Sequence, residues 1–149
     1  MHSMPDLASD RDAIRDLLAR YTYHGDRGRI DDLAACFAPD GVLEYPGAAP
    51  CGPAAIKASL SSGTRDRRLT FIRHHITNPL IIVDGDVATA RSYFCVHSNF
   101  GPDHSGTYDD RIVRTAEGWR FARRRVRIDW QTKASLFRPM VTRPNNLTP

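Results

Sequence analysis

Residues 69–100 read LTFIRHHITNPLIIVDGDVATARSYFCVHSNF, and this stretch decides the fold. It contains two long runs rich in β-branched and aromatic residues, 69–83 and 87–100, on either side of Asp84-Gly85-Asp86. An Asp-Gly pair between two such runs is typical of a tight β-hairpin. We therefore predict two long antiparallel strands that pair with each other.

The residues that follow predict a second hairpin. We expect a looser turn over 101–106, a strand over 108–114, a turn over 115–118 and a last strand over 119–130. Alternation in the last strand sends Arg123, Arg125 and Arg127 to one face and residues 124, 126 and 128 to the other. A basic face of this kind is usually solvated or paired with carboxylates, and it lacks the interleaved aromatic residues that stack nucleic-acid bases. Despite the net charge of +4, we expect no nucleic-acid partner.

The first 60 residues carry helical patterns instead. Ser9 is expected to cap a first helix, in which apolar residues recur at helical spacing from Ile14 to Tyr21 before Gly25 ends it. A second helix is expected over 31–37, ended by turn residues at 39–41, and then a short strand over 42–45 and a third helix over 54–60. Helices followed by antiparallel strands are typical of the α+β class.

We therefore predict an α+β domain in which three N-terminal helices pack in a long, curved sheet. Such a sheet leaves an opening on its concave side, and openings of this kind bind small molecules through apolar walls and a few polar groups. A chain of 149 residues suits one hydrophobic core. We place a flexible N-terminus at 1–8, one domain at 9–132 and an irregular C-terminal tail at 133–149.

Nothing in the sequence predicts secretion or a membrane span. No apolar run approaches the ~20 residues that a span needs, and residues 1–10 show no apolar stretch behind a basic start. Cys36, Cys51 and Cys95 are odd in number and widely spaced. We therefore expect three unpaired thiols and a cytoplasmic location, with no membrane partner.

Two groups of polar residues could carry chemistry. Tyr21, Tyr23 and Asp26 lie at the end of the first helix, where a tyrosine ring that faces the core needs a partner for its hydroxyl. His74 and His75 lie in a strand, so one faces the concave side and the other faces away. Imidazole is the side chain best matched to proton transfer near neutral pH. A lone aspartate in a loop, or a lone histidine in a strand, is more often structural, and both interpretations stay open here.

Metal and cofactor sites are not expected. Two histidines on opposite faces of a strand do not form a metal site, and the sequence has no HxH or HxxxH pair. It also has no GxGxxG, Walker, GxSxG or HExxH motif. His97 and His104 flank the predicted turn and are expected to face solvent. Asp109 and Asp110 begin a strand, so one of them is expected to face inward.

Several motifs together resemble the SnoaL-like family. They are Tyr-x4-Asp at 21–26, LAACFAPDG at 33–41, His-x3-Asn at 74–78, VDGDVA at 83–88, GTYDDR at 106–111 and GWRFARR at 118–124. The resemblance covers roughly residues 10 to 130. It implies the cone-shaped α+β barrel of the nuclear-transport-factor-like superfamily, with a strongly curved, mixed and mostly antiparallel sheet.

Within that superfamily, scytalone dehydratase and the bile-acid dehydratases eliminate water with a tyrosine, an aspartate and a histidine and without a cofactor. The resemblance assigns these catalytic roles to Tyr21, Asp26 and His74. Tyr23 and His75 could exchange the roles if the register shifts by one residue. The remaining candidates for lining the pocket are Asn78, Tyr45, Phe94, Tyr108 and Asp110.

The predicted activity is a dehydratase-type lyase or an isomerase that acts by proton transfer on a hydrophobic, polycyclic or aromatic-like carbonyl compound; the same proton transfer could close a ring. One alternative is a non-catalytic protein that binds small molecules. Another is an assembly subunit, like the small subunit of ring-hydroxylating dioxygenases. We also expect a homo-oligomer, a dimer or trimer like its relatives, because Phe94, Val96, Phe121 and Val126 give the sheet more apolar surface than three short helices cover.

Overall fold

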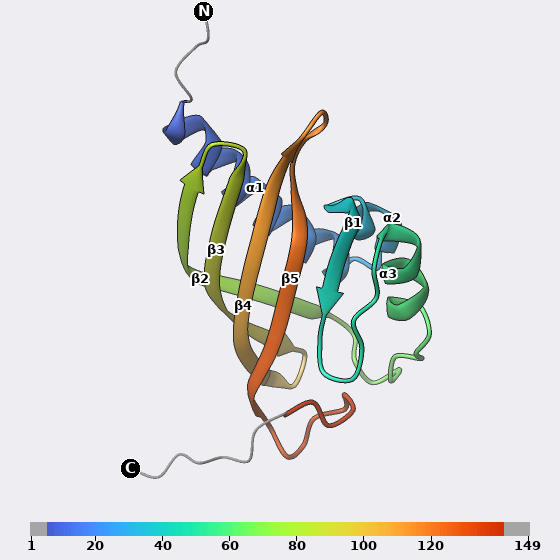
Figure 1. The fold of residues 1–149 in the computed structure, drawn as a ribbon. Coiled ribbons are helices and arrows are strands. Elements are labelled where there is room, and N and C mark those ends of the chain that lie inside the picture. Colours follow the sequence, from blue (N-terminus) through green and yellow to red (C-terminus); the bar gives the residue numbers. More distant parts are fainter. Residues whose placement is uncertain (1–5, 142–149) are drawn as a thin grey trace, which may run out of the picture.

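The computed structural model describes residues 6–141 and confirms the α+β class, with helices packed against one mixed sheet (Figure 1). The strand order is β1-β5-β4-β3-β2, and β1 pairs with β5 in parallel while the other neighbours are antiparallel. The elements are α1 (Leu7–Asp26), α2 (Ile30–Ala34), β1 (Phe37–Glu44), α3 (Pro53–Leu60), β2 (Ile72–Asp84), β3 (Val87–Ser98), β4 (Gly101–Thr115) and β5 (Gly118–Gln131).

The two predicted hairpins are present, but the turn between them is much shorter than predicted. Gly85 has a φ of 60° and closes the β2–β3 hairpin, as the Asp-Gly pair indicates. The predicted loose turn over 101–106 is wrong, because β4 already begins at Gly101. The backbone N–H of Phe100 donates to the Ser98 hydroxyl oxygen, and this bond helps to close the chain into a tight turn. Residues 101–106 therefore belong to the sheet.

Strand β2 contains a bulge that changes which residues face inward. The pairing with β3 shifts between Thr77 and Leu80, and Asn78 has a φ of 54°. Asparagine tolerates this left-handed conformation, and the following Pro79 has no N–H to give to the ladder. Before the bulge the even-numbered residues are the more buried, whereas after it Ile81 is buried. The predicted pocket-lining residue Asn78 is instead exposed, because the bulge takes it off the face that His74 and Ile76 share.

The first helix begins earlier than predicted. A carboxylate oxygen of Asp6 accepts hydrogen bonds from the backbone N–H groups of Ala8 and Ser9, so Asp6 is the cap and Ser9 lies inside the helix. The predicted boundary of the N-terminal segment at 1–8 therefore includes helical residues. Residues 1–5 and 142–149, which belong to the two predicted irregular ends, lie outside the described residues.

The second helix is shorter than predicted, and the first strand is longer. Helix α2 ends at Ala34, and Phe37 pairs with Phe121 of β5 instead of extending the helix. The predicted turn at 39–41 is instead an irregularity inside β1, between Phe37 and Val42. Gly41 allows this close approach, because a Cβ atom there would lie 2.6 Å from the carbonyl oxygen of Phe121.

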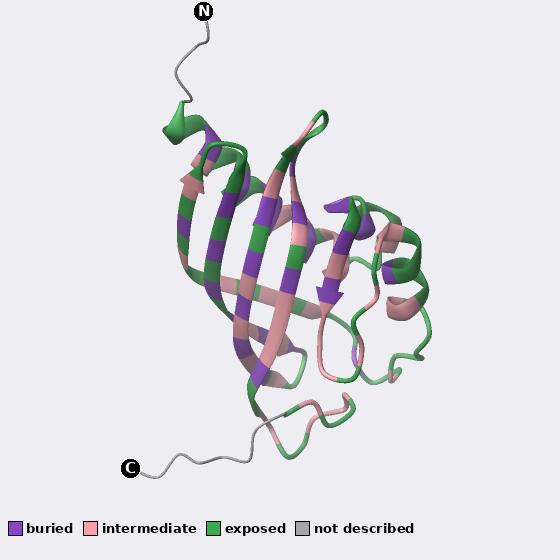
Figure 2. Cartoon of the chain, viewed as in Figure 1, coloured by how far each residue is buried: buried purple, intermediate pink, exposed green. Residues whose placement is uncertain are grey.

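The core lies between the helices and the inner face of the sheet, which is lined with buried residues along β3, β4 and β5 (Figure 2). Phe94, Val96 and Phe121 are fully covered there, so they do not supply the apolar surface on which the oligomer prediction rested. Exposed apolar side chains lie instead on the outer face of β2 and β3, at Leu80, Ile82 and Tyr93. The three cysteines are free, and within residues 6–141 no helix is long and apolar enough to cross a membrane.

Candidate functional site

The predicted aspartate and histidine meet at the end of α1. Asp26 is the last residue of the helix, and the Nδ1 atom of His74 on β2 lies 2.6 Å from one of its carboxylate oxygens. The backbone N–H of His74 donates to the other carboxylate oxygen at 3.0 Å. Both oxygens of Asp26 therefore hold the same residue, and the orientation of the imidazole is fixed although the two residues are 48 positions apart.

The contact also sets the tautomer of the imidazole. A carboxylate can only accept hydrogen bonds, so Nδ1 of His74 carries the proton that it donates to Asp26. In the neutral imidazole the lone pair is then on Nε2, at the far side of the ring. The Asp26 side chain is 6% exposed and that of His74 is 26% exposed, so the histidine is the accessible member of the pair. This arrangement suits a base whose positive charge, once formed, is stabilised by the carboxylate.

His74 lines a small inner chamber of about 210 Å³ together with Tyr21. The other walls are Thr22, Gly25, Ile30, Leu33 and Leu60, so most of the lining is apolar. A larger outer chamber of about 720 Å³ shares Leu60 with it and contains the predicted residue Tyr45, whose hydroxyl is hydrogen-bonded to Ser59. The inner chamber therefore combines apolar walls with the polar groups of Tyr21 and His74, as sites for small hydrophobic molecules do, and the wider outer chamber adjoins it at Leu60.

Tyr21 is held rigidly beside His74. Its ring makes edge contacts with Phe37, Tyr108 and Phe121 at centroid distances of 5.9 to 6.1 Å. Burial raises the pKa of Tyr21 to about 12, although the nearby Arg124 guanidinium acts in the opposite direction. The hydroxyl therefore stays protonated at neutral pH and is available as a hydrogen-bond donor.

A buried ion pair stands behind Tyr21. Arg124 is fully buried, and two of its guanidinium nitrogens each donate to a carboxylate oxygen of Asp110 at 2.8 Å. Its guanidinium carbon lies 3.9 to 4.3 Å from the centroids of the Tyr21, Tyr108 and Phe121 rings. The strand alternation predicts that Arg124 faces opposite to its basic neighbours, but it does not predict this aromatic cage. Asp110 is occupied by Arg124 and does not line either chamber.

The remaining candidates lie away from the inner chamber. Tyr23 is 59% exposed, and His75 is exposed and packs its ring against His97 at 5.0 Å. Both line a separate groove of about 440 Å³ between α1 and β2, which His74 also borders. Phe94 and Tyr108 are buried and stacked on each other at 4.4 Å, and they line neither chamber.

A second histidine–aspartate pair lies within residues 101–106, where the sequence predicts a turn with a solvent-facing His104. His104 is buried, and its Nδ1 atom lies 2.7 Å from a carboxylate oxygen of Asp103. Burial lowers the pKa of His104, although Asp103 acts against this effect. The prediction that His104 faces solvent is wrong because residues 101–106 are part of β4. Extending the even-numbered alternation of 108, 110 and 112 back along that strand would have placed His104 inside.

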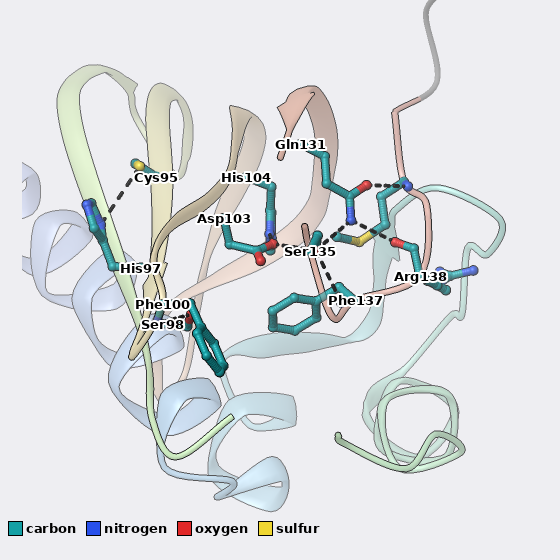
Figure 3. Close-up of polar contacts among 11 residues, drawn as sticks. Cys95, His97, Ser98, Phe100, Asp103, His104, Gln131, Ser135, Phe137 and Arg138 are labelled. Atoms are coloured by element: carbon teal, nitrogen blue, oxygen red, sulfur yellow. Dashed lines mark hydrogen bonds and ion pairs between the residues drawn. The ribbon is translucent and has the colours of Figure 1, made fainter. Parts of the chain in front are cut away.

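The segment after β5 closes part of the outer chamber. It has no regular secondary structure over 132–141, and its residues Leu136, Phe137, Arg138 and Met140 line the chamber. Polar contacts hold this segment to the ends of β4 and β5 (Figure 3). The Ser135 hydroxyl donates to Asp103, and the Gln131 amide bonds the backbone of Arg138 and Met140. The described part of the tail is therefore ordered by specific contacts.

The structure offers no ready metal centre. Within residues 6–141, no group of three or more histidine, cysteine, aspartate or glutamate side chains is arranged to hold a metal ion. His74 and His104 each use Nδ1 to bond a carboxylate instead.

Comparison with known proteins gives one family. Residues 6–125 match the family of the SnoaL-like domain. The uncharacterized protein Rv2910c of Mycobacterium tuberculosis is 34% identical over 124 residues, which cover 78% of this chain and 83% of that protein.

Two solved structures from Novosphingobium aromaticivorans are also similar. One is a predicted scytalone dehydratase, with a TM-score of 0.75 and 27% identity over 90% of this chain and 93% of that one. The other is described as NTF2-like with a cystatin-like fold, with a TM-score of 0.74 and 30% identity over 89% of this chain and 96% of that one. Both likenesses extend over almost the whole described fold.

Proposed function

The chain belongs to the SnoaL-like domain family, and on this premise we propose that it is a cofactor-free lyase of the dehydratase type, or an isomerase. Its substrate is a small, hydrophobic carbonyl compound with a ring system. The observation that carries the proposal is the Asp26–His74 pair, because its accessible imidazole lines the same 210 Å³ chamber as the protonated hydroxyl of Tyr21.

The reaction begins with proton transfer from carbon. Nε2 of His74 takes a proton from the carbon next to the substrate carbonyl, and the electron pair of the C–H bond moves toward the carbonyl oxygen. Tyr21 donates a hydrogen bond to the enolate oxygen that forms, where the negative charge develops in the transition state. Asp26 stabilises the imidazolium through the bond to Nδ1.

The second half of the reaction returns the proton. In a substrate with a hydroxyl group one carbon further along, the imidazolium donates its proton to that hydroxyl as the C–O bond breaks. Water leaves, and the enolate collapses to a conjugated carbonyl compound. Where no hydroxyl can leave, the same proton returns to a different carbon and the product is an isomer. A carrier protein would need only the chambers, and the fixed orientation of the His74 imidazole would then have no function.

The first step can be tested without the natural substrate. In D₂O, the protein should exchange the protons next to the carbonyl of an aromatic bicyclic ketone such as 1-tetralone, and proton NMR follows this exchange. His74→Gln should remove the exchange above background, because an amide cannot take up a proton at neutral pH. His75→Gln is the matched control, since the neighbouring ring faces away from the chamber and packs on His97. Exchange that persists in His74→Gln would refute the proposal.

A further inference from the structure

The lining of the outer chamber carries an unbalanced positive charge. Arg65 and Arg138 line it, and Asp66 is the one acidic residue among the described residues that do so. The carboxylate of Asp66 is already bound by Arg68, through both the guanidinium and the backbone N–H at 2.7 to 3.0 Å. Within residues 6–141, neither Arg65 nor Arg138 forms an ion pair with a carboxylate. Among the described residues, these two guanidinium groups at the chamber thus have no negative partner.

Arg138 is fixed in place at both ends, unlike most exposed arginines. Its backbone carbonyl accepts a hydrogen bond at 3.0 Å from the Gln131 amide, which is itself bound to Ser135 (Figure 3). Its guanidinium donates one hydrogen bond to the carbonyl of Pro46 at 2.8 Å. The guanidinium also lies 5.9 Å from the centroid of the Tyr45 ring. Much of the entropy that an arginine loses on binding a ligand has therefore already been lost.

The carbonyl of Pro46 does not neutralise the positive charge of Arg138. The remaining N–H groups of Arg138 are therefore suited to a negatively charged acceptor from outside the protein. A guanidinium offers five donors in a planar fork, and the Pro46 bond uses one of them. Oxyanions are the groups that match this fork. We infer that Arg138, assisted by Arg65, forms an anion subsite in the outer chamber, and that the ligand of these chambers carries a carboxylate or phosphate group.

The anion subsite itself does not depend on the proposed function. Only the identification of its ligand as the substrate rests on that function. In that case the substrate has two ends. The carbonyl end enters the inner chamber beside His74 and Tyr21, and the anionic end stays in the wider outer chamber beside Arg138. A neutral polycyclic ketone would leave both arginines unused and would bind more weakly than an acid of the same shape.

The test compares probes that differ only in charge. We would measure dissociation constants by calorimetry for 2-naphthoate, the neutral 2-naphthamide and 2-naphthyl phosphate. The unmodified protein should bind naphthoate about tenfold more tightly than naphthamide, as expected for one partly exposed charge-assisted contact. Arg138→Gln should remove this advantage and leave naphthamide binding unchanged. Tighter binding of the naphthyl phosphate than of naphthoate would indicate a phosphate group on the natural ligand, and the reverse order a carboxylate.

One control variant makes the result decisive. Arg67→Gln removes the same charge from the same loop as Arg65, but Arg67 does not line the chamber, so naphthoate binding should change less than twofold. Calorimetry measures binding and does not depend on turnover, so failure of the proposed chemistry in the deuterium-exchange assay is separable from failure of the anion subsite. Equal affinities for naphthoate and naphthamide, equal losses in Arg67→Gln and Arg138→Gln, or no naphthoate binding at millimolar concentration would each overturn the inference.

Discussion

His74 and His104 each place Nδ1 against an aspartate oxygen, at 2.6 and 2.7 Å, but in very different surroundings. The partner of His74 comes from a helix 48 residues away, and the imidazole borders a chamber. The partner of His104 is the preceding residue, and its ring is enclosed between Phe94 and Phe137. The same kind of hydrogen bond is therefore found once at the wall of a chamber and once in the interior of the fold.

Burial explains why the two pairs should have different roles. The His74 side chain is 26% exposed and that of His104 is 7% exposed. Desolvation lowers the pKa of His104, so this ring is neutral at pH 7. The carboxylate of Asp103 also accepts a hydrogen bond from Ser135, and this bond joins β4 to the tail. We therefore assign chemistry to the Asp26–His74 pair and attachment of the tail to the Asp103–His104 pair.

The largest predicted effect is a difference between the deuterium-exchange rates of the His74 and His104 variants. His74→Gln should slow deuterium exchange into a bound ketone by about a thousandfold, within the range for loss of a general base. His104→Gln should slow it less than tenfold, because His104 lines neither chamber. Proton NMR in D₂O measures both rates, and circular dichroism checks that both variants fold. A similar loss in the two variants would show that both histidines transfer protons.

The two aspartates should differ in the same way, with a smaller effect. Asp26→Asn should slow the exchange about ten- to hundredfold, because an amide keeps the ring in position but does not stabilise its positive charge. Asp103→Asn should leave the rate almost unchanged and lower the free energy of unfolding by about 1–3 kcal/mol. Urea unfolding measures the stability of each variant. A rate loss without a stability loss in Asp103→Asn would reverse the assignment.

The sequence predicts the strands around the two histidine–aspartate pairs better than the contacts within the pairs. The Asp-Gly pair at 84–85 correctly predicts the hairpin, and alternation correctly predicts that Arg124 faces opposite to Arg123 and Arg125. The contact between Asp26 and His74 follows from the family resemblance. Neither periodicity nor spacing predicts it, because a bond across 48 residues depends on the whole fold.

The errors arose where local signals competed with tertiary contacts. Residues 39–41 have the composition of a turn, but Phe37 and Val42 on either side of them pair with β5, so they lie within β1 as an irregularity. Glycine, proline and aspartate at 101–103 likewise indicate a loop, yet β4 begins there and takes His104 into the core. Asn78 could not be placed by alternation, because a bulge changes the phase of the strand.

The acid dependence of stability should also distinguish the two histidines. The pKa of His104 in the folded protein is below the ordinary value of 6.5, and burial is the main cause. At a pH between the lowered pKa of the folded state and 6.5, the unfolded chain binds a proton at this position and the folded chain does not. The free energy of unfolding therefore falls as the pH falls. The contribution of His104 is fully present above about pH 7 and is lost progressively as the pH falls through 6.5 toward the lower pKa of the folded state.

The measurement is a series of urea unfolding curves at pH values from 5 to 8. His104→Gln should be less stable than the original protein at pH 8, but its stability should vary less between pH 7 and pH 5. The two proteins differ only at residue 104, so the difference between the two slopes isolates His104. Equal slopes would mean that the ring of His104 takes up a proton freely in the folded state.

The smallest predicted effect concerns the link between the buried pair and the tail. The Ser135 hydroxyl donates to Asp103 at 2.8 Å and accepts the backbone N–H of Phe137 at 3.1 Å. Ser135→Ala should lower the free energy of unfolding by about 1 kcal/mol, the net value of a typical hydrogen bond. Ser62→Ala is the control, because that hydroxyl bonds only to the nearby Ser59 carbonyl among the described residues.

Amide hydrogen exchange measures the effect of Ser135→Ala at individual backbone N–H groups. If the Asp103–His104 pair attaches the tail, Ser135→Ala should speed exchange at the backbone N–H groups of Phe137 and Met140, which this network protects. Exchange at His74, whose N–H is bound to Asp26, should not change. Faster exchange at His74 as well would show that the two pairs form one cooperative unit, because loss of a tail contact would then loosen the Asp26–His74 pair. Separate responses would show that the protein uses one kind of bond for two independent purposes.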